Sequence, residues 1–280
     1  MEIFESFCFD EYKRIFEYEY NSSQLNNHDE KRRFSQKKAI KLSSINAMKK
    51  FPQIEPTDIW KTIYIAHVNN VSGIVDQKVI QNVISADNSW KKSSGHAFEE
   101  MIRDIGNIHL EIHGIRILLQ KELSVELHNN NIANEVRDIS WLKEQVKSSI
   151  FDLYLTIKNN DKYLVYGCIQ SKTSIRDRVT RDREPSINAM NAFFISIAIV
   201  MNGDFLKLPK FTNMVNGGSP EYDVNGWHAM YVLTHEEIDN DRIKSIDLEM
   251  EKLITDCKYA AESWTKDRQW INPAWNMTVV

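Results

Sequence analysis

The chain has 280 residues, of which 42% are hydrophobic and 10% aromatic, so it can build at least one substantial core and is not disordered overall. Its net charge of −4 argues against a protein that coats nucleic acid through overall charge, although a local basic cleft remains compatible. The three cysteines, Cys8, Cys168 and Cys257, are far apart and form no CxxC pair, which argues against a Cys-rich zinc site and a disulfide framework.

The start of the chain does not resemble a secretory signal, because residues 1–20 are acidic and lack a basic region followed by an apolar one. The longest apolar run, residues 192–201, is about half the length that a membrane span needs. We therefore expect a cytoplasmic protein without a membrane partner.

Residues 1–90 are predicted to form a helical N-terminal subdomain. Apolar residues recur at helical spacing over residues 2–20, and the polar stretch 21–30 is typical of a loop. Residues 31–50 contain eight Lys or Arg and no acid, a pattern that fits a solvated helix face and a phosphate-binding face equally well. Thr57 and Asp58 are candidates to cap the next helix.

Residues 91–280 are predicted to form a mixed α/β domain. Ser93, Ser94 and Gly95 resemble the start of a helix over residues 96–105, with Phe98 on its apolar face. The further expected elements are strands at 115–119, 150–157, 163–170 and 228–234, a helix or strand over 187–200, loops at 171–185 and 214–226, and a helix over 235–261.

Asp152 is an acid inside an apolar strand pattern, IFDLYL, and a buried carboxylate is costly unless a cation or a metal ion compensates it. The next predicted strand ends in Gln170, Ser171 and Lys172. If the two strands form a hairpin, Asp152 and Lys172 lie close together. A carboxylate that binds Mg²⁺ and an ammonium that orients a water molecule are suited to phosphodiester hydrolysis, although a structural ion pair explains the same two residues.

A single carboxylate is a poor Mg²⁺ site, so further acids are expected nearby. The candidates are Glu99 on the predicted helix and, after Lys172, either Glu184 or Asp182. Glu100 points away from Glu99 on a helix and serves as a comparison for ordinary surface charge.

The loop 171–185 alternates arginines with acids in the sequence SKTSIRDRVTRDREP. Arg176 and Arg178 can each donate two hydrogen bonds to a guanine edge, and Asp177 can accept one from cytosine. The segment is therefore a candidate reader of C·G pairs in the major groove. An exposed helix with internal salt bridges is the simpler interpretation of the same letters.

Taken in order, these segments resemble the CCGG-recognising restriction endonucleases of the PD-(D/E)XK nuclease superfamily. The resemblance covers about residues 90–190 and matches Asp152 to the strand acid and Lys172 to the catalytic lysine. The sequence SGHAFE, which ends at Glu99, is similar to a helix segment of some members. Gln170 departs from the pattern, because an acid is common there, and no proline precedes Asp152.

The resemblance implies a mixed β-sheet flanked by helices and a site whose catalytic residues are Asp152, Lys172, Glu99 and Glu184. Mg²⁺ would be held by Asp152, Glu99 and Glu184, with Asp182 as the competitor for the last position. Arg176, Asp177 and Arg178 would read the DNA.

The resemblance also implies a type II restriction endonuclease that acts as a homodimer on double-stranded DNA. Its site would be a palindrome, typically of six base pairs with CCGG at the centre, cut to leave 5′ overhangs. A cognate DNA methyltransferase is the expected genetic partner.

Two other functions remain open from the sequence: another nuclease of the same superfamily, acting in repair or junction resolution, and a DNA-binding regulator that does not cut. His109 and His113 have the spacing of a zinc pair, but the glutamate of HLEIH is misplaced for metalloprotease chemistry, so we take them as ordinary polar residues. Cys168 and the tryptophans Trp264, Trp270 and Trp275 are expected in a core or an interface.

Overall fold

The computed structural model describes residues 2–173, 179–203 and 208–277. The chain divides into two compact units, Met1–Lys91 and Lys92–Val280. The sequence pattern predicts a division after residue 90. Within the described ranges, no helix is both long and apolar enough to cross a membrane.

The N-terminal unit contains the first part of α4, described below, and three helices that pack together: α1 (Glu2–Ser22), α2 (His28–Lys50) and α3 (Pro56–Ser72). They pack around a core that includes Cys8, Tyr12 and Ile63. The cap expected at Thr57 and Asp58 is wrong, because α3 begins one residue earlier with Pro56 in its first turn. Proline suits this position since its fixed φ is already helical and the missing N–H has no helical partner there.

Helix α4 (Gln77–Leu110) is continuous across residues 93–95, so the expected helix start there is wrong. A Cβ at Gly95 would meet nothing within 4 Å, so the glycine marks neither a tight turn nor a close contact. Apolar residues at helical spacing continue on both sides of it, with Ile80 before and Phe98 and Ile102 after, all buried. Residues 85–90 between them are exposed. Serine and glycine each cost a helix no more than about 1 kcal/mol, so Ser93, Ser94 and Gly95 do not by themselves end α4.

The C-terminal unit is built on a six-stranded mixed sheet in the order β1-β2-β3-β4-β5-β6, which confirms the expected fold class. Strands β1 to β3 are antiparallel, and β3 to β6 are parallel neighbours. The strands are β1 (Ile115–Leu119), β2 (Leu153–Asn159), β3 (Lys162–Lys172), β4 (Ile195–Met201), β5 (Ala229–Leu233) and β6 (Ile243–Ile246).

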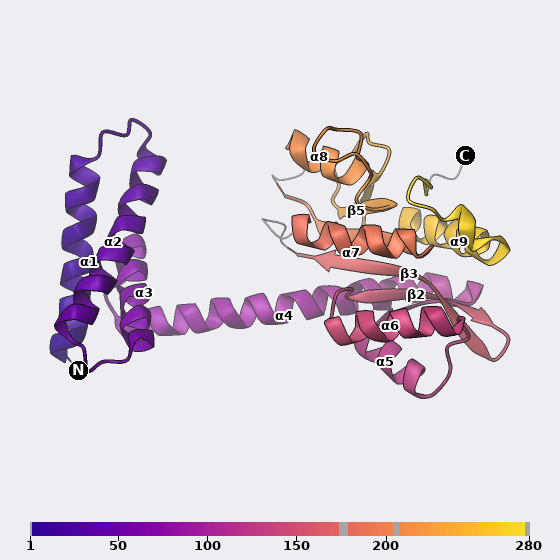
Figure 1. Ribbon diagram of the computed structural model, residues 1–280, viewed down its shortest axis with the longest axis horizontal. Helices are drawn as coiled ribbons and strands as arrows, with labels where there is room; N and C mark the ends of the chain where they lie inside the picture. Colours follow the sequence, from indigo (N-terminus) through magenta and orange to yellow (C-terminus); the bar gives the residue numbers. More distant parts are fainter. Residues whose placement is uncertain (1, 174–178, 204–207, 278–280) are drawn as a thin grey trace. The chain divides into compact units, whose positions relative to one another are not determined.

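Helices cover both faces of this sheet (Figure 1). The C-terminal half of α4 and helix α9 (Glu251–Lys266) pack on one face. The other face is covered by α5 (Gln120–His128), α6 (Val136–Ser148), α7 (Val179–Asn191) and α8 (Pro209–Asn216). Cys168 is buried in this second layer, as expected, and burial raises the pKa of its thiol.

Three boundaries differ from the sequence-based expectations. The loop predicted over residues 171–185 is wrong at both ends, since β3 continues to Lys172 and residues 179–185 belong to α7. The apolar run 187–200 is divided between the end of α7 and β4. The long helix expected over 235–261 is replaced by β6 and α9, because Ile243 and Ile246 pair with β5.

Candidate active site

Asp152 and Lys172 meet at neighbouring ends of the β2–β3 hairpin. The Lys172 ammonium Nζ donates to Asp152 Oδ2 at 3.1 Å, and the Ser171 backbone N–H donates to the same oxygen at 2.7 Å. Both side chains are partly exposed, at 20% for Asp152 and 28% for Lys172, so solvent or a substrate can reach them. The hairpin expected from the sequence is thereby present.

Asp152 does not lie inside a strand, contrary to the prediction from the sequence pattern. It lies in a bend directly before β2, while its neighbours Phe151 and Leu153 are buried. Its backbone N–H donates to Ile169 O at 3.1 Å, and its carbonyl accepts from Gln120 N at 3.2 Å. The main chain is therefore fixed on both sides, and the carboxylate projects from a rigid support.

Glu99 comes to the same place from α4. Burial raises the pKa of its carboxyl, the hydrogen bond from His96 lowers it, and the charge of Asp152 raises it again. Lys172 acts on Glu99 in the opposite direction. Because the charges of Asp152 and Lys172 both act on the pKa of Glu99, the Glu99 carboxyl lies near these two side chains, while the adjacent Glu100 is exposed.

Of the two candidates for the last acid, Asp182 and Glu184, Asp182 is the one near Lys172. Asp182 Oδ2 lies 4.0 Å from Lys172 Nζ, and its side chain is 26% exposed. Glu184 is exposed and forms no hydrogen bond or ion pair with the described residues. Asp182 and Glu184 are two positions apart on α7, which places their side chains about 200° apart around the helix axis. The helix therefore cannot direct both carboxylates to one side.

Gln170 explains why Asp182 lies where it does. The Gln170 side chain is buried; its Nε2 donates to Asp182 O at 3.0 Å and its Oε1 accepts from Trp227 Nε1 at 2.7 Å. Both ends of the amide are thus occupied. Gln170 therefore connects the first turn of α7 to the sheet.

Arg183 makes a second attachment of the same turn. Its guanidinium donates to Met214 O at 3.3 Å and to Val224 O, and it lies over the Tyr222 ring with 5.0 Å to the centroid. The predicted reader residues Arg176, Asp177 and Arg178 lie outside the described residues, between Lys172 and this turn.

The donors present suit a hard divalent cation. Asp152, Glu99 and Asp182 offer carboxylate oxygens, and Mg²⁺ typically binds one or two carboxylates together with substrate phosphate oxygens. Across the ranges that the structure describes, no three His, Cys, Asp or Glu side chains come together as a ready-made metal cluster. His109 and His113, at the end of α4 and in the short helix Glu111–His113, belong to no such cluster.

Residues 130–270 match the model of the BsaWI restriction endonuclease type 2 family. A solved structure described as a pre-specific restriction endonuclease BsaWI–DNA complex is 55% identical, with 98% of each chain covered and a TM-score of 0.84. The chain belongs to this family. It is a type II restriction endonuclease, a site-specific DNA endonuclease, and this confirms the resemblance seen in the sequence.

A second solved structure, a specific restriction endonuclease AgeI–DNA complex, is 16% identical over 90% of this chain and 91% of that chain, with a TM-score of 0.45. No curated protein sequence matches the chain. Membership in the BsaWI family excludes the non-cutting regulator and disfavours the repair nuclease that the sequence left open.

The sequence did not predict several residues that shape this candidate site. The attachments made by Gln170 and Arg183 join positions that are 57 and 41 residues apart in the chain, to Trp227 and Val224. The only local signal was Gln170 itself, a polar residue at the end of an apolar strand where the superfamily commonly has an acid.

Proposed function

We propose that this endonuclease makes Mg²⁺-dependent double-strand cuts at a palindromic DNA site containing CCGG, of six base pairs, leaving 5′ overhangs. The observation that carries the catalytic part is the contact between Lys172 Nζ and Asp152 Oδ2 at the ends of a rigid hairpin. The CCGG specificity rests on the sequence resemblance of residues 176–178 to a known type of reader.

In this proposal Asp152, Glu99 and a third acid hold Mg²⁺. We favour Asp182 over Glu184 as that acid, because Asp182 lies 4.0 Å from the Lys172 ammonium and Glu184 is exposed. The bound ion would supply Lewis acidity toward the scissile phosphate and lower the pKa of a coordinated water molecule. The donor set supports this assignment, since all three groups are carboxylates.

Lys172 has two roles in the proposal. Its ammonium is held beside Asp152, so it can hydrogen-bond the attacking water and fix its position next to the phosphorus atom. Its positive charge also offsets the negative charge that develops on the phosphate oxygens. The Ser171 N–H keeps the Asp152 carboxylate oriented while the lysine serves the substrate.

Arg176, Asp177 and Arg178 are proposed to read C·G pairs in the major groove. A palindromic site requires two copies of this reader related by a two-fold axis, so we propose a homodimer in which each subunit cuts one strand. The relative of known structure was solved with DNA, which supports double-stranded DNA as the substrate. We expect the enzyme in the cytoplasm, with a cognate methyltransferase protecting the host DNA.

Plasmid digestion with and without Mg²⁺, followed by sequencing of the fragment ends, tests the proposal directly. We expect discrete fragments only with Mg²⁺, each ending at a CCGG-containing site with a 5′ extension. Fragments that end at random sequences would refute the recognition proposal, and cutting in the presence of a chelator would refute the metal proposal.

A further inference from the structure

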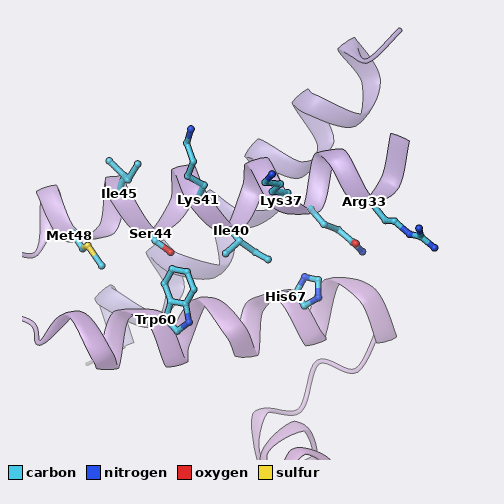
Figure 2. Close-up of a pocket in the computed structure, with 10 residues that line it drawn as sticks. Arg33, Lys37, Ile40, Lys41, Ser44, Ile45, Met48, Trp60 and His67 are labelled. Atoms are coloured by element: carbon cyan, nitrogen blue, oxygen red, sulfur yellow. The ribbon is translucent and has the colours of Figure 1, made fainter. Parts of the chain in front are cut away.

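A groove between α2 and α3 in the N-terminal unit is bordered by positive charge (Figure 2). Its volume is about 650 Å³. Arg33, Lys37 and Lys41 border it from α2, and Trp60 lies on the opposite, α3 side. We call Arg33, Lys37 and Lys41 the α2 basic stripe. The stripe lies outside residues 130–270, which match the family model.

The stripe is exposed and unneutralised. All three side chains are exposed, and within the described ranges none of them forms a hydrogen bond or an ion pair. Arg14 on α1 shows the ordinary alternative, since its guanidinium is paired with Glu11 at 2.7 Å. The stripe therefore presents three free cations on one side of one helix.

The spacing of the stripe is unfavourable for the helix itself. Arg33, Lys37 and Lys41 follow one another at four-residue intervals, and like charges at that spacing destabilise an isolated helix. A helix face that only needed solvation would be more stable with acids interspersed, as happens between Arg14 and Glu11. Binding of an anion beside the stripe would offset the repulsion between these like charges and so explain the arrangement.

Charge is also segregated along the chain as a whole. Residues 31–50 hold eight of the 35 Lys and Arg and no acid, which leaves 27 basic residues against 39 acidic ones elsewhere. An acidic protein with one basic helix has a localised positive potential, which is the electrostatic signature of a polyanion-binding surface.

We propose that the α2 basic stripe binds the phosphate backbone of duplex DNA, outside the bases that the enzyme reads. Four helical residues advance about 6 Å, which is close to the separation of neighbouring phosphates along one strand of the duplex, so successive cations can contact successive phosphates. DNA is favoured over an acidic peptide because the enzyme already acts on this polyanion. The inference rests on the endonuclease function but not on the proposed site or metal ion.

The test compares two triple variants of the full-length enzyme. The stripe variant is Arg33→Gln, Lys37→Gln, Lys41→Gln. The control variant is Lys13→Gln, Lys61→Gln, Lys78→Gln, which removes the same charge from exposed positions on α1, α3 and α4 of the same unit. Binding to a 40-base-pair duplex without CCGG is followed by fluorescence anisotropy over a range of KCl concentrations, without divalent ions.

We expect the stripe variant to bind about tenfold more weakly, with a slope of log K against log salt concentration shallower by about 2–3. The control variant should keep the wild-type slope. Equal changes of slope in both variants would mean that only the overall charge of the protein matters, which would overturn the proposal. An unchanged slope in the stripe variant would also overturn it.

The alternative is that a second copy of the chain binds in the groove. Analytical ultracentrifugation of the same proteins tests this alternative, because it measures the oligomeric state. A stripe variant that changes its oligomeric state but keeps the wild-type salt slope would overturn DNA binding in favour of that interface. Failure of the wild type to cut at CCGG sites would refute the proposed specificity, while the slope comparison, measured on DNA lacking CCGG, would stand.

Discussion

Lys244 in the C-terminal unit and Lys37 in the N-terminal unit have the same side chain in opposite surroundings. Lys244 is 7% exposed, donates to Asp256 at 2.7 Å and to Met277 O at 2.8 Å, and shares Asp256 with the Tyr231 hydroxyl. Lys37 is exposed, and no described residue pairs with it. A buried charge must be neutralised inside the fold, whereas an exposed one stays available to a ligand.

This difference between paired and unpaired lysines corresponds to different roles of the two units. In the C-terminal unit the polar groups near the sheet are bonded to one another, which holds the proposed catalytic side chains to within a narrow geometry. The cations of the α2 basic stripe have no partner among the described residues, which suits a polyanion whose phosphates need no exact alignment. The predictions below test whether this division holds, from the largest expected effect to the smallest.

Replacement of Lys172 by Ala should reduce the cleavage rate by on the order of 10²–10⁴-fold, because the ammonium would no longer orient the water or offset developing charge. Binding of cognate DNA should stay within a few-fold of wild type. Single-turnover cleavage and anisotropy on the same duplex measure the two effects. Lys162, at the other end of β3, provides the control Lys162→Ala, which should cut normally.

Asp182→Asn should slow cleavage by about 10–100-fold, whereas Glu184→Gln should change it less than about twofold. The reason is geometric, since only Asp182 is near Lys172. Comparing the rates over a Mg²⁺ titration shows whether the loss lies in metal affinity. The opposite ranking of the two variants would return Glu184 to the site and exclude Asp182.

His228 gives the C-terminal unit a pH-dependent stability. Burial lowers its pKa to about 4, against a hydrogen bond to Asn272 that raises it, while Arg242 lowers it further. Its Nδ1 accepts from the Ser196 N–H at 3.0 Å, so Nε2 carries the proton and donates to Asn272 O.

Between pH 6.5 and 4 the unfolded chain binds a proton at His228 that the folded chain excludes, so stability falls as the pH falls through this window. We expect this residue to account for about 2 kcal/mol of lost unfolding free energy between pH 7 and 5. Urea denaturation of wild type and His228→Asn at both values measures it. Parallel losses in the two proteins would rule His228 out as the cause.

Trp60→Ala should change the unfolding free energy by no more than about 0.5 kcal/mol, because the ring is 56% exposed at the border of the groove. Ile63→Ala, one turn further along α3 but 1% exposed, should cost about 2–5 kcal/mol and calibrates the measurement. A large loss for Trp60→Ala in thermal or urea unfolding would mean that the groove is part of the core.

Sequence patterns predicted those parts of the fold that depend on neighbouring residues. The bounds of β1 and the β2–β3 hairpin follow from short apolar runs separated by a polar turn, and the helical N-terminal region follows from its periodicity. The contact between Asp152 and Lys172 could be foreseen because a hairpin is local.

Long-range partners could not be foreseen in the same way. Strand β6 was missed because the short sequence IKSI becomes a strand only beside β5. The start predicted for α4 was wrong because α4 runs through Ser93, Ser94 and Gly95 despite their weak helix propensity. Likewise, the hydrogen bond between Gln170 and Trp227 spans 57 residues, so no local pattern could select Asp182 over Glu184.

The backbone at Asp152 has a practical value of its own. Its N–H and C=O are bonded to Ile169 and Gln120, so the position of this residue does not depend on its side-chain charge. Asp152→Asn should therefore give a protein that no longer cuts DNA but still binds its recognition sequence. Such a protein could block a chosen sequence reversibly or capture fragments carrying it from a mixture, without damaging them.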